Sequence, residues 1–201
     1  MQMQMRRSFQ ENPLIALRYD IKRVRSLVKS RNPLIRLIYP YTCAGIQMLI
    51  LHRLVRWNMY TRIPVLQQIL YVLLKITTSV FQITWGIMIS RGSDIGRGLY
   101  IAHHGGIWIG VESMGTNCNV SHAVTIGRTE KETGFPTIGN NVYFGVGCLV
   151  IGRIKIGDNV KIGPYAVVRK DVLPNTVVMA SPPRSISIKV DDSESERGES
   201  V

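Results

Sequence analysis

Large apolar residues recur every six positions through the second half of the chain. An α-helix repeats every 3.6 residues and a flat β-strand every two, so neither explains a period of six. Glycine follows the apolar residue seven times, and a second apolar or small residue stands three positions after the glycine position. The repeated apolar residues are Ile95, Ile101, Ile107, Met114, Val120, Ile126, Ile138, Phe144, Val150, Ile156, Ile162 and Val168.

This pattern predicts a parallel β-helix. Each hexapeptide supplies one inward corner residue and one inward wall residue, and stacked turns bury a column that no single turn could bury alone. Glycine suits the corner, where a side chain has no space. The wall residues are Leu99, Gly105, Val111, Cys118, Val124, Val142, Cys148, Ile154, Val160 and Ala166.

A twelve-residue step from Ile126 to Ile138 interrupts the pattern, because Glu132 stands where an apolar residue is due. The six-residue phase is the same on both sides of the step. The intervening segment, RTEKETGFPT, is therefore predicted to leave the solenoid as a loop. Loops extruded from rigid scaffolds are common places for binding sites.

The first part of the chain carries a helical pattern instead. Apolar residues three and four positions apart form stripes, and Pro64 opens a further helix that we expect to end near Lys75. Pro33, Pro40 and Gly45 are interpreted as breaks between helices. The stripes consist of Ile21, Val24, Leu27 and Val28, and then of Ile46, Leu49, Ile50, Leu54 and Trp57.

Three parts are thus expected: a helical region at 1–75, the β-helix at 76–184 and an acidic tail at 185–201, to which we assign no structure. The uncharged stretch between Lys75 and Arg91 has fifteen residues, fewer than the roughly 20 that a spanning helix needs. The N-terminus lacks the apolar segment of a secretory signal. We therefore expect a cytoplasmic protein without a membrane-spanning segment.

The formal charge of +12 is concentrated near the N-terminus, where residues 1–63 carry twelve Lys or Arg against two acidic residues. This surplus fits the solvated faces of amphipathic helices, and it would also attract the chain to an anionic membrane surface. We expect no nucleic-acid binding, because no recognition motif accompanies the charge. Of the three cysteines, Cys118 and Cys148 fall on wall positions and are predicted to be buried core residues in a reducing compartment.

Two histidines stand beside paired glycines in GLYIAHHGGIWIG, residues 98–110. Together with NVSHAVTIG, NNVYFGVGCLVIGRIKIGDNVKIGPYAVV and ASPPR, this segment resembles the serine acetyltransferase family of left-handed β-helix acyltransferases. The likeness extends to RNPLIRLIYPYTCAGIQMLILHRLVRW in the helical region and covers roughly residues 20–185. It implies a mainly β protein, a left-handed parallel β-helix preceded by a small α-helical region.

The resemblance also implies a function. Members of this family transfer acetyl from acetyl-CoA, a co-substrate rather than a permanently bound cofactor, to a hydroxyl. They form homotrimers, sometimes paired into a dimer of trimers, with each active site between neighbouring subunits. We expect this assembly here, and we expect Trp108, Tyr143 and Phe144 on the exposed sides that subunits bury.

The family's catalytic histidine falls on His103. An alcohol is a poor nucleophile at neutral pH, and an imidazole within hydrogen-bond reach can remove its proton during attack on the thioester. Adjacent residues of a strand face opposite ways, so His104 is expected to be structural or to contact the acceptor. His122 is interpreted as structural. A zinc hydratase built on the three histidines is a remote alternative, and we expect no metal, because no carboxylate supports them.

By the same resemblance, acetyl-CoA lies along the coils after the loop. Backbone N–H groups there are expected to contact it or to stabilise the oxyanion of the tetrahedral intermediate, except at Pro164, which has no N–H. The turn residues concerned are Gly127, Gly145, Val146, Gly163 and Pro164. The candidates for the CoA phosphates are Lys161, Arg169, Lys170 and Arg184.

The sequence departs from the family where the acceptor binds. Three aspartates of the family, one of them the partner of the catalytic histidine, are replaced by Asn32, Met88 and Ala102, and the loop lacks the family's second histidine. Burying the ammonium group of serine without a carboxylate is costly. The main hypothesis is therefore O-acetylation of a sugar or surface-polysaccharide intermediate. The alternatives are L-serine O-acetylation in cysteine biosynthesis and a catalytically inactive trimeric scaffold.

Overall fold

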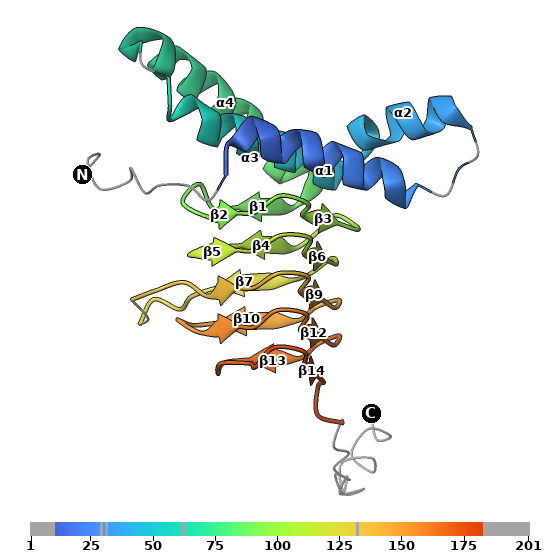
Figure 1. The fold of residues 1–201 in the computed structure, drawn as a ribbon. Coiled ribbons are helices and arrows are strands. Elements are labelled where there is room, and N and C mark those ends of the chain that lie inside the picture. Colours follow the sequence, from blue (N-terminus) through green and yellow to red (C-terminus); the bar gives the residue numbers. More distant parts are fainter. Residues whose placement is uncertain (1–10, 29, 31, 62, 132, 183–201) are drawn as a thin grey trace, which may run out of the picture.

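The computed structural model describes residues 11–28, 30, 32–61, 63–131 and 133–182. A region of four helices covers one end of a solenoid of short parallel strands (Figure 1). The predicted phosphate ligand Arg184 and the tail at 185–201 lie outside the described residues.

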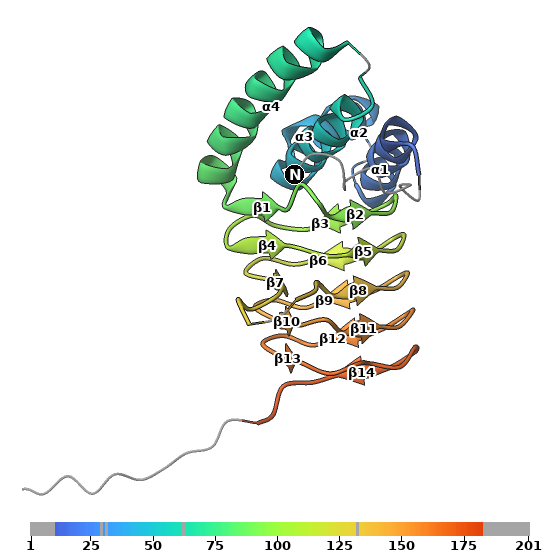
Figure 2. The same ribbon diagram turned by 90° about the vertical axis from the view of Figure 1, so that its left-hand side faces the viewer.

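The solenoid is a three-sided parallel β-helix, as predicted, and its three sheets run along its length (Figure 2). The first sheet contains β1 (Ile87–Ile89), β4 (Ile107–Ile109), β7 (Thr125–Gly127), β10 (Leu149–Ile151) and β13 (Val167–Val168). The second contains β2 (Asp94–Ile95), β5 (Ser113–Met114), β8 (Thr137–Ile138) and β11 (Lys155–Ile156). The third contains β3 (Tyr100–Ile101), β6 (Asn119–Val120), β9 (Tyr143–Phe144), β12 (Lys161–Ile162) and β14 (Val177–Val178).

The predicted apolar column forms the core of the solenoid. All twelve repeated residues are buried, and so are the wall residues with the exception of Gly105, which is exposed because it lies in a turn. In the first sheet, Ile126 pairs with Ile109. Its partner is thus not the repeated residue Ile107, which lies two positions earlier. Phe144 has no exposed surface. The expectation that it lies on an exposed side is therefore wrong, because it is a corner residue of the core.

The register shows where the loop leaves the solenoid. Ile138 pairs with Ile156, so an ordinary coil takes 18 residues. Met114 pairs with Ile138, so the coil between them takes 24. The six extra residues lie between β7 and β8, because the strands before and after them keep their pairing. The predicted extruded loop is thus confirmed.

Asparagines occupy several corners of the solenoid in the left-handed backbone region, where Asn is tolerated better than other residues with a side chain. Asn141, Asn159 and Asn175 have φ values of 56°, 59° and 59°. The side-chain amide of Asn141 donates to Asn159 at 3.1 Å, and that of Asn159 donates to Asn175 at 2.9 Å. These bonds tie successive coils together on the outside, where the apolar column does not reach.

Among the described residues, four helices precede the solenoid: α1 (Pro13–Leu27), α2 (Pro33–Thr42), α3 (Ala44–Asn58) and α4 (Pro64–Trp85). Pro13 and Pro33 each begin a helix after an asparagine whose side chain accepts from a backbone N–H, and Pro64 begins α4 without such a cap. The predicted breaks are partly wrong. Pro40 lies inside α2, and Gly45 lies inside α3, where a Cβ atom would meet the carbonyl oxygen of Ile101 at 2.6 Å. The helix expected to end near Lys75 continues to Trp85.

Arginines of the helices bind the first coil through its backbone carbonyls. The guanidinium of Arg53 pairs with Asp20 at 3.1 Å and donates to the carbonyls of Ile95 at 2.5 Å and Gly96 at 2.8 Å. Arg53 and Asp20 are both buried. Asp20 also accepts from the N–H of Gly98. Helices α1 and α3 are therefore joined to each other and to the solenoid by one buried charge pair.

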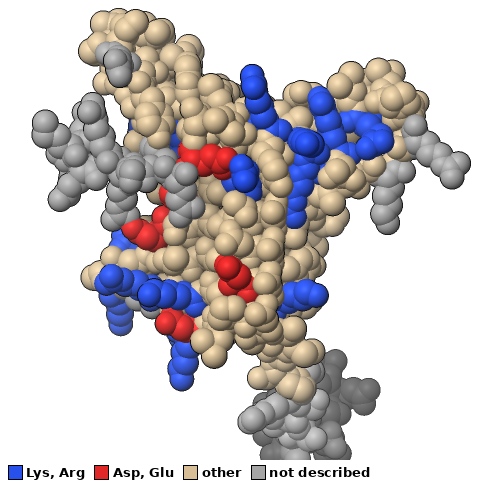
Figure 3. Space-filling model, viewed as in Figure 1, with Lys and Arg blue, Asp and Glu red and all other residues tan. Residues whose placement is uncertain are grey.

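Helix α4 is different, because none of its side chains is buried. Among the described residues, α4 could cross a membrane by length and composition alone, and α2 with α3 could do so only as a pair bent by 60°. The sequence prediction considered the uncharged stretch after Lys75, whereas the 22-residue helix extends on both sides of this lysine. Figure 3 shows Lys and Arg side chains gathered over α1 and α2, which belong to the stretch of residues 1–63 that carries the charge surplus.

The two predicted core cysteines are buried, as expected. Burial raises the pKa of Cys118 to about 11 and that of Cys148 to about 12. Both side chains therefore remain protonated thiols at neutral pH, and neither is a nucleophile.

Replacing Asp20 tests how firmly the helices are held. Burial raises the pKa of Asp20, although Arg53 and the N–H of Gly98 act in the opposite direction. Asp20→Ala leaves Arg53 buried without a charge partner, so we expect the free energy of unfolding to fall by about 3 kcal/mol. Glu11→Ala removes a partly exposed pair with Arg97 and should cost less than about 1 kcal/mol. Urea denaturation measures both values, and equal losses would contradict the assignment.

Candidate active site

His103 lies in the short connection between β3 and β4, at the corner where the chain passes from the third sheet to the first. Its side chain is exposed. Gly105 and Gly106 make the turn that follows, with φ values of 96° and 65° that side chains disfavour. The glycine pair thus closes the connection tightly and leaves the imidazole on the surface.

His122 occupies the same corner one coil further along. Ile101 pairs with Val120 in the third sheet, and each histidine follows its strand residue by two positions. The centroids of the two imidazole rings are 5.6 Å apart, and the rings are inclined by 77°. Nδ1 of His122 is buried and makes no hydrogen bond to any described residue. A ring nitrogen is therefore available beside His103 for a substrate or for the partner imidazole.

His104 has a different neighbour. Its ring meets that of Trp85 edge to face, with centroids 5.4 Å apart. The two adjacent histidines thus have separate surroundings, as the sequence predicts, although neither lies on a strand. The backbone supports this arrangement, because the N–H of Gly105 donates to the carbonyl of Trp85 at 2.8 Å.

The corner of His103 and His122 continues down the solenoid. The register of β6, β9 and β12 places Val146 and then Pro164 two positions after the paired strand residues. The N–H of Gly147 donates to the backbone carbonyl of His122 at 3.1 Å, and the N–H of Tyr165 donates to that of Val146 at 2.8 Å, which confirms the stacking. We call His103, His122, Val146 and Pro164 the corner column. Two of the predicted acetyl-CoA contacts therefore stand below the predicted catalytic histidine.

The backbone donors of this corner are mostly occupied. The N–H of Gly145 donates to Ile162 at 2.8 Å, and that of Gly163 donates to Val178 at 2.7 Å. The prediction that these two glycines offer free N–H groups is therefore wrong, because coil-to-coil hydrogen bonds already use them. The N–H of Val146 has no partner within the described parts of the chain. Val146 is accordingly one residue of the corner column whose backbone can donate to a ligand.

The extruded loop leaves the solenoid at a different corner, between the first and second sheets. Its Phe135 folds back toward the solenoid, because a Cβ atom on Gly110 would lie 3.1 Å from the Phe135 ring. The Arg128 guanidinium lies 5.0 Å from the centroid of that ring. Gly127 lies beside the indole of Trp108, which is 45% exposed. The first sheet therefore separates the loop from the corner column within one chain.

The three positions that lack the family's aspartates are not gathered around His103. Met88 lies on β1 and pairs with Trp108 of β4. Ala102 precedes His103, and its N–H donates to Val120 at 2.9 Å. Asn32 caps α2 by accepting from the N–H of Leu34 at 2.9 Å, and α2 packs on α1 and α3. Within the described ranges, no carboxylate forms an ion pair or hydrogen bond with His103 or His122.

The predicted phosphate ligands are exposed but do not form one cluster. Lys161 lies on β12 of the third sheet, whereas Arg169 and Lys170 follow β13 of the first sheet. The part of the chain that the structure describes contains no group of three or more His, Cys, Asp or Glu residues arranged for a metal ion.

Sequence reasoning assigned only a structural role to His122 and so missed its proximity to His103. A usable signal was present. His103 and His122 are 19 residues apart, and this is also the spacing of the paired residues Ile101 and Val120. Residues one coil apart stack directly, so the spacing places the two imidazoles together.

Comparisons with known proteins agree with this geometry. The sequence model of the bacterial transferase hexapeptide family (six repeats) matches residues 135–170. A serine acetyltransferase of Synechococcus elongatus is 37% identical over 161 residues, which are 78% of this chain and 62% of that protein. One of Mycobacterium tuberculosis is 32% identical, over 84% of this chain and 71% of that protein.

Solved structures agree as well. Brucella abortus serine acetyltransferase in complex with coenzyme A has a TM-score of 0.68 at 27% identity, covering 85% of this chain and 66% of that one. Neisseria gonorrhoeae serine acetyltransferase in complex with serine has a TM-score of 0.65 at 27% identity, and the match covers 86% of this chain and 68% of that one. The chain thus spans about two thirds of the length of the relatives it matches. By its identity to the M. tuberculosis protein and its coverage of that relative, the chain belongs to the serine acetyltransferase family.

Proposed function

We propose that this chain is an acetyl-CoA-dependent O-acetyltransferase that uses His103 as its general base. The observation that carries the proposal is the corner column. An exposed imidazole, a second imidazole with a buried unpaired nitrogen and a free backbone N–H at Val146 follow one another down one corner of a serine acetyltransferase fold.

The chemistry follows from these groups. His103 accepts the proton of the acceptor hydroxyl while the oxygen attacks the thioester carbonyl of acetyl-CoA. The oxyanion that forms needs a donor, and the N–H of Val146 is available for this role. Collapse of the intermediate breaks the carbon–sulfur bond, and the proton held by His103 passes to the CoA thiolate. The products are the acetyl ester and CoA.

L-Serine is the acceptor that we propose first. The relatives from Synechococcus and Mycobacterium carry the name serine acetyltransferase, and the Neisseria protein was solved in complex with serine. The sequence alone led us to prefer a sugar acceptor, and the comparisons favour the alternative.

A neutral sugar hydroxyl is the second candidate, because of the residues around the corner column. Met88 and Ala102 are uncharged, and no carboxylate among the described residues contacts His103. A serine ammonium would have to find its counter-charge elsewhere, whereas a sugar hydroxyl needs none. The two candidates differ in the charge of the acceptor and can be separated by assay.

We also propose a homotrimer, in which the site is completed by a second copy. The loop with Phe135 and the corner column lie at different corners of one chain, so a site that uses both needs two chains. Trp108 and Tyr143, 45% and 43% exposed, supply aromatic surface for such contacts.

Replacing His103 tests the base. His103→Ala should lower turnover by on the order of 10² or more, because the proposed general base is removed, and acetyl-CoA binding should stay nearly unchanged. His104→Ala is the matched control and should lose much less, since His104 packs on Trp85. CoA-thiol release measures turnover, and calorimetry measures binding. Similar losses in both variants would show that His103 is not the base.

The acceptor is identified by measuring CoA release with L-serine and with a panel of nucleotide sugars, lipid-linked sugars and oligosaccharides. We expect turnover with L-serine at millimolar concentration. The variant Ala102→Asp should increase it, because it places a carboxylate next to His103 in the chain, where the ammonium needs a counter-charge. Turnover with sugars alone would support the second candidate. Inactivity toward every acceptor, without acetyl-CoA binding, would leave an inactive scaffold.

Light scattering tests the assembly. We expect the mass of a trimer, or of two trimers, of the 22.6 kDa chain. Trp108→Glu should shift the population toward monomers and lower activity with it, because a charge would be buried in the contact. A stable, fully active monomer would contradict the two-chain site.

A further inference from the structure

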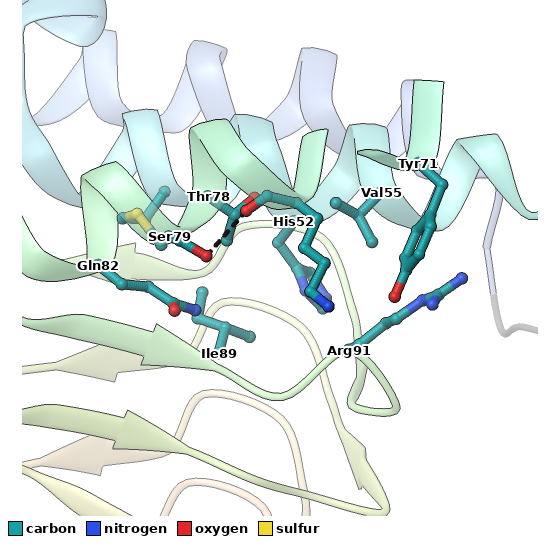
Figure 4. Close-up of a pocket in the computed structure, with 10 residues that line it drawn as sticks. His52, Val55, Tyr71, Thr78, Ser79, Gln82, Ile89 and Arg91 are labelled. Carbon is teal, nitrogen blue, oxygen red and sulfur yellow. Dashed lines mark hydrogen bonds between the residues drawn. The ribbon is translucent and has the colours of Figure 1, made fainter. Parts of the chain in front are cut away.

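A cavity of about 270 Å³ lies away from the corner column, between α3, α4 and the first coil (Figure 4). Met48 and Val55 of α3 and Ile89 of β1 give it apolar walls. In the view of Figure 4, Tyr71 and Arg91 lie at one end and Gln82 at the other. The size suits a small molecule rather than a macromolecule.

His52 provides an unpaired polar atom in this cavity. The residue is only 5% exposed, and its Nε2 is buried without a hydrogen-bond partner. Burial, with the charges of Arg53 and Arg56, lowers the pKa of His52 well below its usual value, so the ring is neutral at pH 7. The backbone of Ser93 acts on this pKa in the opposite direction. Nε2 is a buried ring nitrogen without a partner among the described residues, and it therefore requires one.

Thr78 provides a second unpaired group. Its neighbours Thr77 and Ser79 donate their hydroxyls to the carbonyls four residues earlier, Leu73 and Lys75, at 2.9 Å. The hydroxyl of Thr78 is buried and has no such bond within the described chain. Threonine hydroxyls in helices commonly donate to the carbonyl four residues earlier. A hydroxyl left unpaired in a cavity wall therefore points to an external partner.

The charges of the cavity have one sign. Lys75 and Arg91 line it, and its lining contains no Asp or Glu. Arg91 lies over the ring of Tyr71, with its guanidinium carbon 4.6 Å from the ring centroid. No carboxylate of the described residues pairs with either cation, whereas the nearby Arg53 and Arg56 are paired with Asp20 and Asp94. An anion can therefore be held by two cations that the protein itself leaves unpaired.

We propose that this cavity binds a small organic anion that carries a hydroxyl or amino donor. The anionic group faces Lys75 and Arg91, the donor satisfies Nε2 of His52, and the apolar body contacts Met48 and Ile89. None of the lining residues belongs to the corner column. The site is thus separate from the proposed acetyl transfer and does not depend on it.

The experiment uses three anions that carry a hydroxyl, each with an analogue that lacks it. The pairs are 4-hydroxybenzoate with benzoate, 2-hydroxyisocaproate with isocaproate, and glycerol 3-phosphate with propyl phosphate. Calorimetric titrations of the full chain are made in the presence of CoA, so that anions do not report on a CoA site. We expect at least one hydroxylated anion to bind at millimolar concentration or below, and more tightly than its analogue.

Variants locate the binding. Lys75→Gln with Arg91→Gln should weaken it by on the order of tenfold or more, because the counter-charges are lost. Both side chains are exposed, so this variant should fold, and circular dichroism verifies it. Lys155→Gln, an exposed lysine of the solenoid, is the matched control and should bind as the wild type does. Thr78→Val removes the second unpaired group and should weaken binding less.

Three results would overturn the proposal: no binding of any of the three anions, equal binding of each anion and its analogue, or unchanged binding in the Lys75 and Arg91 double variant. Loss of CoA binding or of transferase activity would bear only on the proposed function, because the anion titration is read independently of catalysis.

Discussion

The rest of the molecule depends on the inward register of one apolar side chain every six residues. Each such side chain, once buried, stabilises the fold by about 1.5–3 kcal/mol, and a shift of one position would turn it outward. The register therefore holds across the loop, where six extra residues leave the solenoid without disturbing the pairing of Met114 with Ile138. The same register stacks equivalent positions of successive coils. The corner column is a consequence of this stacking rather than of a separate arrangement.

The attachment of the helical region depends on a second constraint: backbone carbonyls of the first coil need hydrogen-bond donors. Arg53 supplies donors to two carbonyls there, and Arg56 supplies one to the carbonyl of Ser93. Helix α4 continues this connection, because the carbonyls of Trp85 and Gly86 accept from Gly105 and Ile107 at 2.8 and 2.9 Å. The helix that lines the cavity of His52 thus ends in hydrogen bonds to the turn that follows His103.

Much of this could be predicted from the sequence, because a strict period leaves few choices. The β-helix, its inward residues and the position of the loop follow from spacing alone. The helix boundaries do not. Pro40 lies inside α2 with only Tyr41 and Thr42 after it in the helix. Gly45 lies inside α3, where the solenoid backbone at Ile101 approaches too closely for a side chain.

The site was harder to predict than the fold. The position of His103 followed from the motif, but the contact with His122 required the coil length, which varies between 16 and 24 residues along the chain. The use of the N–H groups of Gly145 and Gly163 by neighbouring coils is likewise invisible in a sequence. The cavity of His52 could not be predicted at all, since its walls come from α3, α4 and β1, and no pattern shows how these three elements meet.

The capping of the first coil by the helices has a further consequence, because it affects whether strands can be added to the solenoid. Sheets of parallel strands have two open edges, each able to template another strand, and β1, β2 and β3 form one of them. The arginines occupy carbonyls of this edge, so addition of a foreign strand there would have to displace charged hydrogen bonds. At the opposite edge, Val167 and Val177 are 60% and 62% exposed. The helical region therefore disfavours growth of this solenoid by added repeats at the end that it covers.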